Sequence, residues 1–257
     1  MTLTLALPEA LAVLCSEGSE PHAWNPVYRF LSRDSAGHRE SHAPGSSLTC
    51  DAEVSDLLRR HVEAPALIVL AVQEGATTHR LRVGLHADGA TVETSHGESP
   101  PTWEELPARE AGRRLAAALP ERLRSAAPEL TQGSPALRRG PTPAQAARLA
   151  AAVRDGAPLA QAVDQLGEAD GDLRDLMLAD RDRVSLTLSL TPVPSTDEPV
   201  VLTRLWVRGD LGLYRIDRSP RLRPEALLVA DGDVLRTLLA LLQQGLSRVA
   251  VTEGAGR

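Results

Sequence analysis

Histidines are the residues of this chain that most invite a metal-binding hypothesis, because two of them have a suggestive spacing. His38 and His42, in the stretch GHRESHA, lie four residues apart, which would place both on one face of a helix. A zinc-protease helix needs a glutamate directly after its first histidine, whereas Glu40 lies midway between the two. The surrounding residues 32–47 are small, polar and turn-forming. We therefore interpret this stretch as a polar loop and predict no metal site.

Motifs for nucleophilic or phosphate chemistry are missing from the sequence. There is no GxSxG, no P-loop and no GxGxxG. Cys15 and Cys50 have no recognisable catalytic context, and two cysteines are too few for a disulfide framework. The stretch GEADGD lacks the further oxygen ligands and the final glutamate of a calcium loop. We predict a protein that is not an enzyme and needs no cofactor.

A dispersed site is the alternative hypothesis. His79, His86 and Glu93 lie on one predicted hairpin and could belong to a small-molecule-binding α+β module or to an enzyme with an unrecognised site. Against this, His79 and His86 are seven residues apart, so they would face opposite sides of a strand.

Composition and charge exclude several classes of protein. The 257 residues are 42% hydrophobic, enough for a sizeable core in one α+β domain. The formal charge of −6 comes without a basic stripe, so we expect no nucleic-acid partner. No apolar run approaches the roughly 20 residues that cross a bilayer, and no basic residue precedes the apolar N-terminus. We expect a cytoplasmic protein with no membrane insertion.

The residues that must position any site fall into recognisable elements. Three aromatic residues within seven positions, Trp24, Tyr28 and Phe30, predict a hydrophobic anchor. In the N-terminal half, about 1–125, a helix is followed by a strand, a turn, a strand, a turn, a strand and a helix that a TWEE capping box would open. These elements are predicted at Asp51–Arg60, Ala66–Val72, Gln73–Thr78, His79–Ala87, Asp88–Gly89, Ala90–Thr94 and Thr102–Leu119.

A similar order recurs after a linker and helices at about 126–170. In the C-terminal half, about 171–252, strands are predicted at Val184–Leu190, Val200–Arg208 and Leu213–Asp217, and a final helix after Asp231 or Asp233. Gly89 of the first half matches Gly212 of the second. Six strands joined mainly by hairpins predict an α+β fold: an internally duplicated, pseudo-twofold antiparallel sheet flanked by helices.

The C-terminal stretch WVRGDLGLYRIDRS…LLVADGDVLRTLLALL resembles the EspG family of proteins associated with type VII (ESX) secretion in actinobacteria. The N-terminal half, with LLRRHVEAP before a strand and a hairpin, is similar as well. Asp210, Gly212 and Tyr214 fit the Asp, Gly and aromatic pattern of the family, and Leu213 stands where the family often has Arg.

The resemblance implies a cytosolic, non-enzymatic chaperone. Family members bind the hydrophobic helical tip of a secreted PE–PPE substrate pair and keep it soluble before export, so the expected partner is a PE/PPE-like or WXG-like helical heterodimer. The family's contact surface includes the loop after the first long strand of the N-terminal half. By position that loop is a predicted partner-binding segment here, namely Gln73, Glu74, Gly75, Ala76, Thr77 and Thr78.

Overall fold

A computed structural model describes residues 2–16, 18–36, 51–124, 137–139, 144, 147–148, 151, 182–192, 199–209, 212–217 and 225–254. Up to residue 124 its elements are β1 (Thr2–Thr4), α1 (Leu7–Ser16), η1 (Pro21–Ala23), α2 (Pro26–Ala36), α3 (Ala52–Val62), β2 (Ala66–Glu74), β3 (Thr77–Leu85), β4 (Ala90–His96), β5 (Thr102–Leu106), α4 (Ala108–Ala117) and η3 (Glu121–Arg124). The later elements are β6 (Leu137–Arg139), β7 (Arg183–Leu190), β8 (Val200–Gly209), β9 (Gly212–Asp217), β10 (Glu225–Val229) and α8 (Asp233–Gly254).

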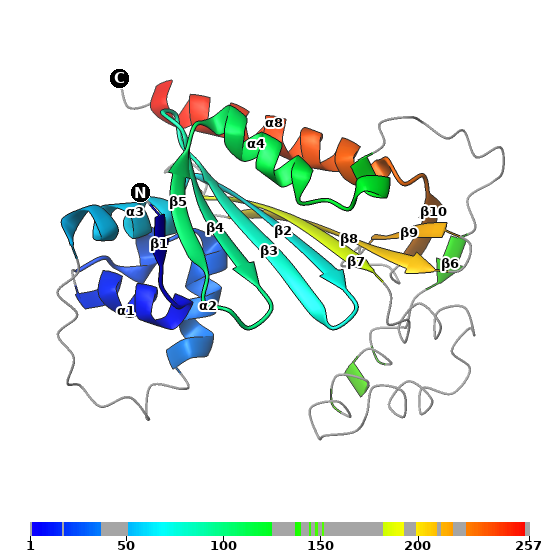
Figure 1. Ribbon diagram of the computed structural model, residues 1–257, viewed down its shortest axis with the longest axis horizontal. Coiled ribbons are helices and arrows are strands. Elements are labelled where there is room, and N and C mark those ends of the chain that lie inside the picture. The colour runs from blue at the N-terminus through cyan, green and yellow to red at the C-terminus, as the bar shows by residue number, and fades with distance from the viewer. Residues whose placement is uncertain are drawn as a thin grey trace.

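All ten strands belong to one sheet, in the order β1-β5-β4-β3-β2-β7-β8-β9-β10-β6 (Figure 1). Every neighbouring pair is antiparallel. Helices are segregated onto the faces of this sheet, so the predicted α+β class is confirmed.

Strand order is symmetric about the central pair of β2 and β7. From each of these two strands a four-stranded meander runs outward, and a short earlier strand, β1 or β6, closes the edge. Gly89 and Gly212 nevertheless do different things. Gly212 has φ +140°, which favours glycine, whereas a Cβ on Gly89 would lie 3.0 Å from the carbonyl oxygen of Leu106. A gene duplication as the origin of the symmetric order stays a prediction.

Two sequence-based expectations about these elements are corrected by the structure. Thr102–Glu105 does not cap a helix, because it forms β5, which pairs with both β4 and β1 and buries Trp103. The helix begins later, at Ala108, after Pro107. The sheet also has ten strands where six were predicted. The predicted linker and helices at 126–170 lie outside the described residues, apart from β6 and a few isolated positions. So do Cys50, His38 and His42.

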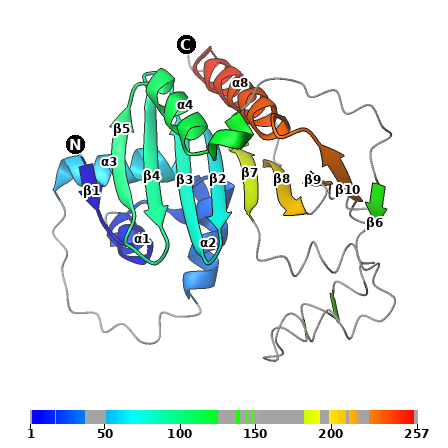
Figure 2. The same ribbon diagram turned by 45° about the vertical axis from the view of Figure 1, so that its right-hand side comes forward.

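The two faces of the sheet carry separate cores. We call the face under α4 and α8 the first face; its core includes Ile68, Leu186 and Trp206. The second face lies under α1, α2 and α3 in the N-terminal half, and its core includes Leu67 and Trp103 (Figure 2). Alternation of side chains along each strand assigns every strand residue to one face or the other.

The aromatic cluster of the sequence divides on folding. Trp24 and Tyr28 are fully buried in the second-face core, as predicted for an anchor, but Phe30, two residues after Tyr28 in α2, is 65% exposed. Among the described residues, no helix is long and apolar enough to span a membrane.

Candidate functional site

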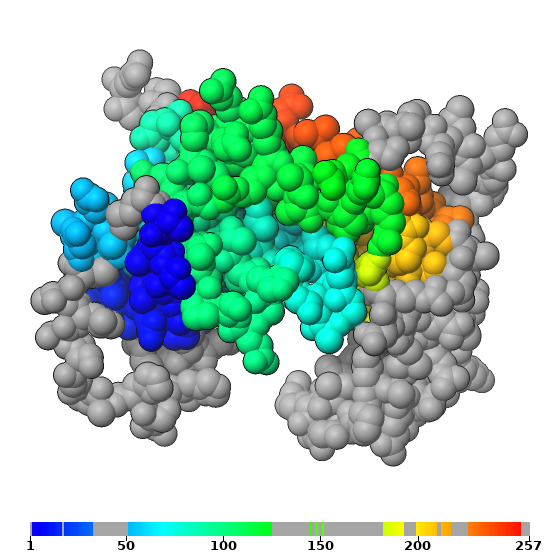
Figure 3. Space-filling model, in the orientation of Figure 1, coloured from blue at the N-terminus to red at the C-terminus, as the bar shows by residue number. Residues whose placement is uncertain are grey.

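The predicted partner-binding segment, Gln73–Thr78, forms the tight hairpin between β2 and β3. Glu74 pairs with Thr77, and Gly75 has φ +57° at the first central position, which is typical of a type II′ turn. Glu74, Gly75 and Ala76 are exposed at the tip, and Figure 3 shows the cyan hairpin at the surface on the lower side of the sheet, beside the green atoms of the β4–β5 region. The tip of the segment is therefore accessible, and its centre is a regular two-residue turn within the stretch where the sequence predicts a short turn.

The alternative site of His79, His86 and Glu93 is not assembled. His79 contacts His96, His86 contacts Thr91, and Glu93 accepts hydrogen bonds from Tyr28 and Arg82. His79 thus lies apart from the other two, whereas a chain of hydrogen bonds connects His86 to Glu93.

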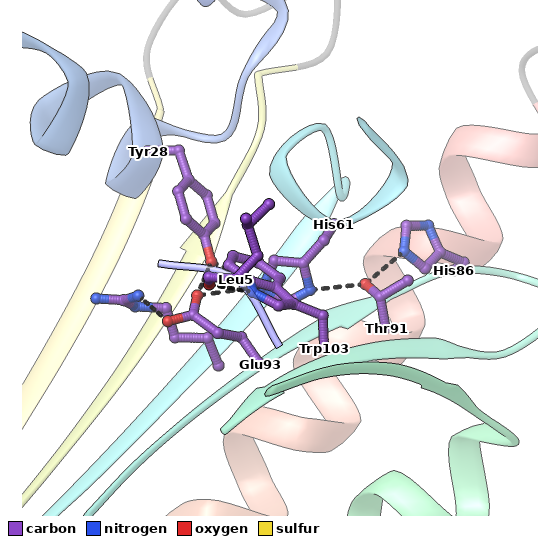
Figure 4. Close-up of polar contacts among 8 residues, drawn as sticks. Leu5, Tyr28, His61, His86, Thr91, Glu93 and Trp103 are labelled. Atoms are coloured by element: carbon purple, nitrogen blue, oxygen red, sulfur yellow. Dashed lines mark hydrogen bonds and ion pairs between the residues drawn. The ribbon is translucent and has the colours of Figure 1, made fainter. Parts of the chain in front are cut away.

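Glu93 belongs instead to a buried polar cluster on the second face, which we define as Tyr28, His61, Arg82, His86, Thr91 and Glu93 (Figure 4). These residues come from α2, α3, β3, β4 and the turn after β3. Except for His86, which is partly exposed, every member is buried. The cluster joins the helices of the N-terminal half to the sheet.

Hydrogen bonds in the cluster run in one direction. Arg82 forms an ion pair with one oxygen of Glu93, and the Tyr28 hydroxyl donates to the other oxygen at 2.6 Å. Because its proton points to the carboxylate, the hydroxyl oxygen accepts a hydrogen bond from Nε2 of His61 at 2.7 Å. Nδ1 of His61 then carries a lone pair and accepts from the Thr91 hydroxyl at 2.9 Å, which in turn accepts from Nε2 of His86 at 3.2 Å.

Protonation states follow from burial. Burial lowers the pKa of His61 to about 4, an effect that the Glu93 charge opposes and that Arg82 reinforces. Burial and then the Glu93 charge raise the pKa of Tyr28 well above its usual value. Burial and then Arg60 lower the pKa of His86 to about 4. At neutral pH both imidazoles are neutral and the phenol is protonated, as the hydrogen-bond direction requires.

Packing around the cluster closes it to substrates. The His61 ring lies edge-on between Tyr28 and Trp103, with ring centroids 5.5 and 5.1 Å apart. Only His86 reaches outside, where it lines an open depression of about 360 Å³ with Arg60, Pro65 and Val249. Arg60 is itself paired with Asp88 and Glu105. The arrangement holds a buried ion pair in place and offers no reacting position to a substrate.

The part of the second face that β7 and β8 form carries side chains of a different kind from those of the buried polar cluster. Apart from Arg183 at the start of β7, the side chains on this face that are not buried are Ser185, Thr187, Val201, Thr203 and Leu205, which we call the β7–β8 surface. Val201 is 49% exposed, Thr203 is exposed, and the Thr187 and Thr203 hydroxyls are hydrogen-bonded at 3.1 Å. None of these five side chains is charged.

Helix α2 borders this surface. The Asn25 amide, one residue before α2, donates to the carbonyl of Ser189, and Ser189 lies directly opposite Val201. Phe30 is therefore an exposed aromatic on the helix that flanks the β7–β8 surface. At the other end, Gln73 of the hairpin lies opposite Arg183, the first residue of β7. The β7–β8 surface thus lies between the start of α2 at one end of β7 and the hairpin at the other end, and we take these three parts together as the candidate site.

No protein-family model matches the chain, and no curated protein matches it. Among solved structures, the chain is similar to the Mycobacterium tuberculosis type VII secretion system chaperone EspG5, in a structure of its complex with a PE25-PPE41 dimer. The similarity covers 97% of this chain and 96% of that chain, with 11% sequence identity and a TM-score of 0.44.

Proposed function

We propose that the protein is a cytoplasmic, non-enzymatic chaperone that binds a helical, secreted-type protein pair through the β7–β8 surface. The observation that carries this proposal is the exposure of Phe30 and Val201 on and beside the β7–β8 surface, whose five side chains are uncharged. The resemblance of the sequence to the EspG family supports the class of partner, a PE–PPE-like heterodimer.

Desolvation explains why such a surface suits an apolar helical tip. Covering a charged side chain costs several kcal/mol unless it is paired, whereas covering hydroxyls that already bond to each other costs little. Thr187 and Thr203 satisfy one another in this way. Burial of Phe30 and Val201 against apolar side chains of a partner then contributes about 25 cal/mol per Å² removed from water.

The hairpin Gln73–Thr78 contributes the edge of the proposed site. Its exposed tip, Glu74 to Ala76, extends beyond the start of β7, so a partner that covers the β7–β8 surface along the strands would reach it. Because Gly75 fixes a tight turn, the hairpin offers a preformed contact that loses little conformational entropy on binding.

Co-expression with a PE–PPE-like heterodimer tests the proposal. We expect the wild-type chain to co-purify with the pair as a complex of defined stoichiometry. Phe30→Glu and Val201→Glu should each weaken binding at least tenfold. Val251→Glu is the matched control, since Val251 is 61% exposed but lies on α8, over the other face of the sheet.

Equal loss of binding in the Val251→Glu control would overturn the assignment of the surface. Failure of the wild-type chain to bind any such pair would overturn the proposed function. Circular dichroism of each variant checks that the fold is kept.

A further inference from the structure

A second pair of histidines, unrelated to the buried polar cluster, lies on the first face of the sheet. His79 of β3 is directly opposite His96 of β4, and their Nδ1 atoms are 2.7 Å apart. The two ring centroids are only 3.9 Å apart. His96 is exposed and His79 is partly exposed, so the pair is open to solvent.

Regular pairing of β3 with β4 holds the backbone of His79 and His96 in place. The ladder of β3 and β4 pairs residues continuously from Leu85 and Ala90 down to His79 and His96. Just beyond the pair, the amide of Gly97 donates to the carbonyl of Thr78 at 2.9 Å. The strand pairing therefore keeps the Cβ atoms of His79 and His96 at a fixed distance from each other, so the two imidazoles stay close together.

The separation of the two nitrogens matches one kind of metal coordination. Two nitrogen ligands about 2.0 Å from a metal and at right angles to each other lie roughly 2.8 Å apart, whereas a tetrahedral angle requires about 3.3 Å. The observed 2.7 Å between the Nδ1 atoms is a hydrogen-bond distance in the free protein, and it lies close enough to the right-angled value that the two nitrogens need to move little to bind such an ion. Right angles between ligands are typical of square-planar and tetragonal Cu²⁺ and Ni²⁺.

Charges near the pair favour a cation. By strand alternation, the β3 and β4 residues on this face are hydroxyl-bearing or apolar apart from the two histidines, and Arg80 and Arg82 lie on the opposite face. Glu74 is on the same face of the sheet. It lies opposite Thr77, which precedes His79 by two residues on the side of the hairpin tip. Its carboxylate adds negative charge on that side.

We propose that His79 and His96 form a two-histidine site for a divalent transition-metal ion of square-planar or tetragonal preference, Cu²⁺ or Ni²⁺. The site is independent of the proposed chaperone function. In the free protein one Nδ1 carries the proton that the pair shares. On metal binding that proton moves to Nε2 of the same ring, so both Nδ1 lone pairs coordinate the ion and water fills the other positions. Among the described residues no third His, Cys, Asp or Glu side chain joins the pair in a metal-binding cluster.

Titration of the full chain with Ni²⁺ by calorimetry, and with Cu²⁺ by electron paramagnetic resonance, tests the site. To remove binding by the GHRESHA stretch, the background carries His38→Gln and His42→Gln. We expect one equivalent of Ni²⁺ to bind, and the Cu²⁺ spectrum to show two equatorial nitrogen donors. His79→Gln and His96→Gln should each weaken binding at least tenfold and remove one nitrogen from the spectrum.

His22→Gln is the matched control, because His22 is an exposed histidine near Glu20 in η1. It should bind Ni²⁺ as tightly as the background. If His79→Gln and His96→Gln leave the affinity unchanged, or if His22→Gln lowers it equally, the site is overturned. Thermal unfolding of each variant without metal should match the background within a degree or two, since both side chains are at the surface.

Discussion

The second face of the sheet is used in opposite ways by its two halves. Over β3 and β4 it holds charged and titratable groups that are sealed under α2 and α3, with every donor of the hydrogen-bond chain directed towards Glu93. Over β7 and β8, beyond Arg183 at the start of β7, it presents uncharged hydroxyl and aliphatic side chains, two of them exposed. The charged and titratable side chains of the second face are thus mostly buried, whereas the uncharged side chains of the β7–β8 surface are accessible to a partner.

Removing one charge from the buried polar cluster should lower the free energy of unfolding more than any other change considered below. Glu93→Gln leaves the guanidinium of Arg82 buried without its carboxylate, and breaking a buried ion pair in this way costs about 3–5 kcal/mol. Urea unfolding at pH 7 measures the loss.

The double variant Arg82→Gln with Glu93→Gln is the control for that prediction. It removes both charges, so it should recover part of the lost free energy of unfolding. A double variant less stable than Glu93→Gln alone would show that the ion pair is not the source of the effect.

Lowering the pH should weaken the same half more than the other. The pKa of His61 is about 4 in the folded protein and about 6.5 in an unfolded chain, so the unfolded state takes up the proton first as pH falls. The contribution of neutral, buried His61 to the free energy of unfolding is complete above about pH 6.5 and is lost between about pH 6.5 and pH 4. It amounts to a loss of about 2 kcal/mol at pH 5, with a further loss in the same direction from His86.

Unfolding free energies measured at pH 7, 6 and 5 check this window. His22→Gln, which changes an exposed histidine outside the cluster, is the control variant. His61→Gln should lose less stability than the wild type between pH 7 and pH 5. A wild-type curve that is flat over this range would contradict the neutral, buried state of His61.

Thr91 is the link whose loss should have an intermediate effect. Thr91→Val keeps the shape of the side chain but removes the hydroxyl between His61 and His86, which leaves a buried Nδ1 without a donor and costs about 1–2 kcal/mol. Nitrogen chemical shifts of His61 report the change directly, since they depend on whether Nδ1 accepts a hydrogen bond. Unchanged His61 shifts in Thr91→Val would contradict the proposed direction of the chain.

The sequence predicts the sheet better than it predicts what the strands bring together. Alternation over His79–Ala87 and the apolar run Ala66–Val72 give strands β3 and β2 within one or two residues of their observed bounds. The TWEE motif misleads, because Thr102–Leu106 has two strand neighbours to pair with and tertiary pairing outweighs a local capping preference.

The candidate sites depend on register, which the sequence leaves open. A two-residue turn centred on Asp88–Gly89 would place His79 opposite Glu98, whereas the observed turn lies one residue earlier and places it opposite His96. His61 could be expected on a helix, but its contacts with Tyr28 and Thr91 join residues 33 and 30 positions apart in the chain. Exposure of Phe30 was missed because a helix of mixed character does not reveal which aromatic faces the core.

The smallest effect on stability is expected from the reverse exchange in the other half, Val201→Thr. Val201 is half exposed, and a hydroxyl placed there can bond to water, so the free energy of unfolding should change by less than about 0.5 kcal/mol. Thr91→Val and Val201→Thr exchange the same two side chains, one inside the polar cluster and one on the β7–β8 surface. Comparing the two variants by urea unfolding separates the effect of burial on the free energy of unfolding from the effect of exchanging threonine and valine. If Val201→Thr costs as much as Thr91→Val, the β7–β8 surface is covered in solution and is not free to bind a partner.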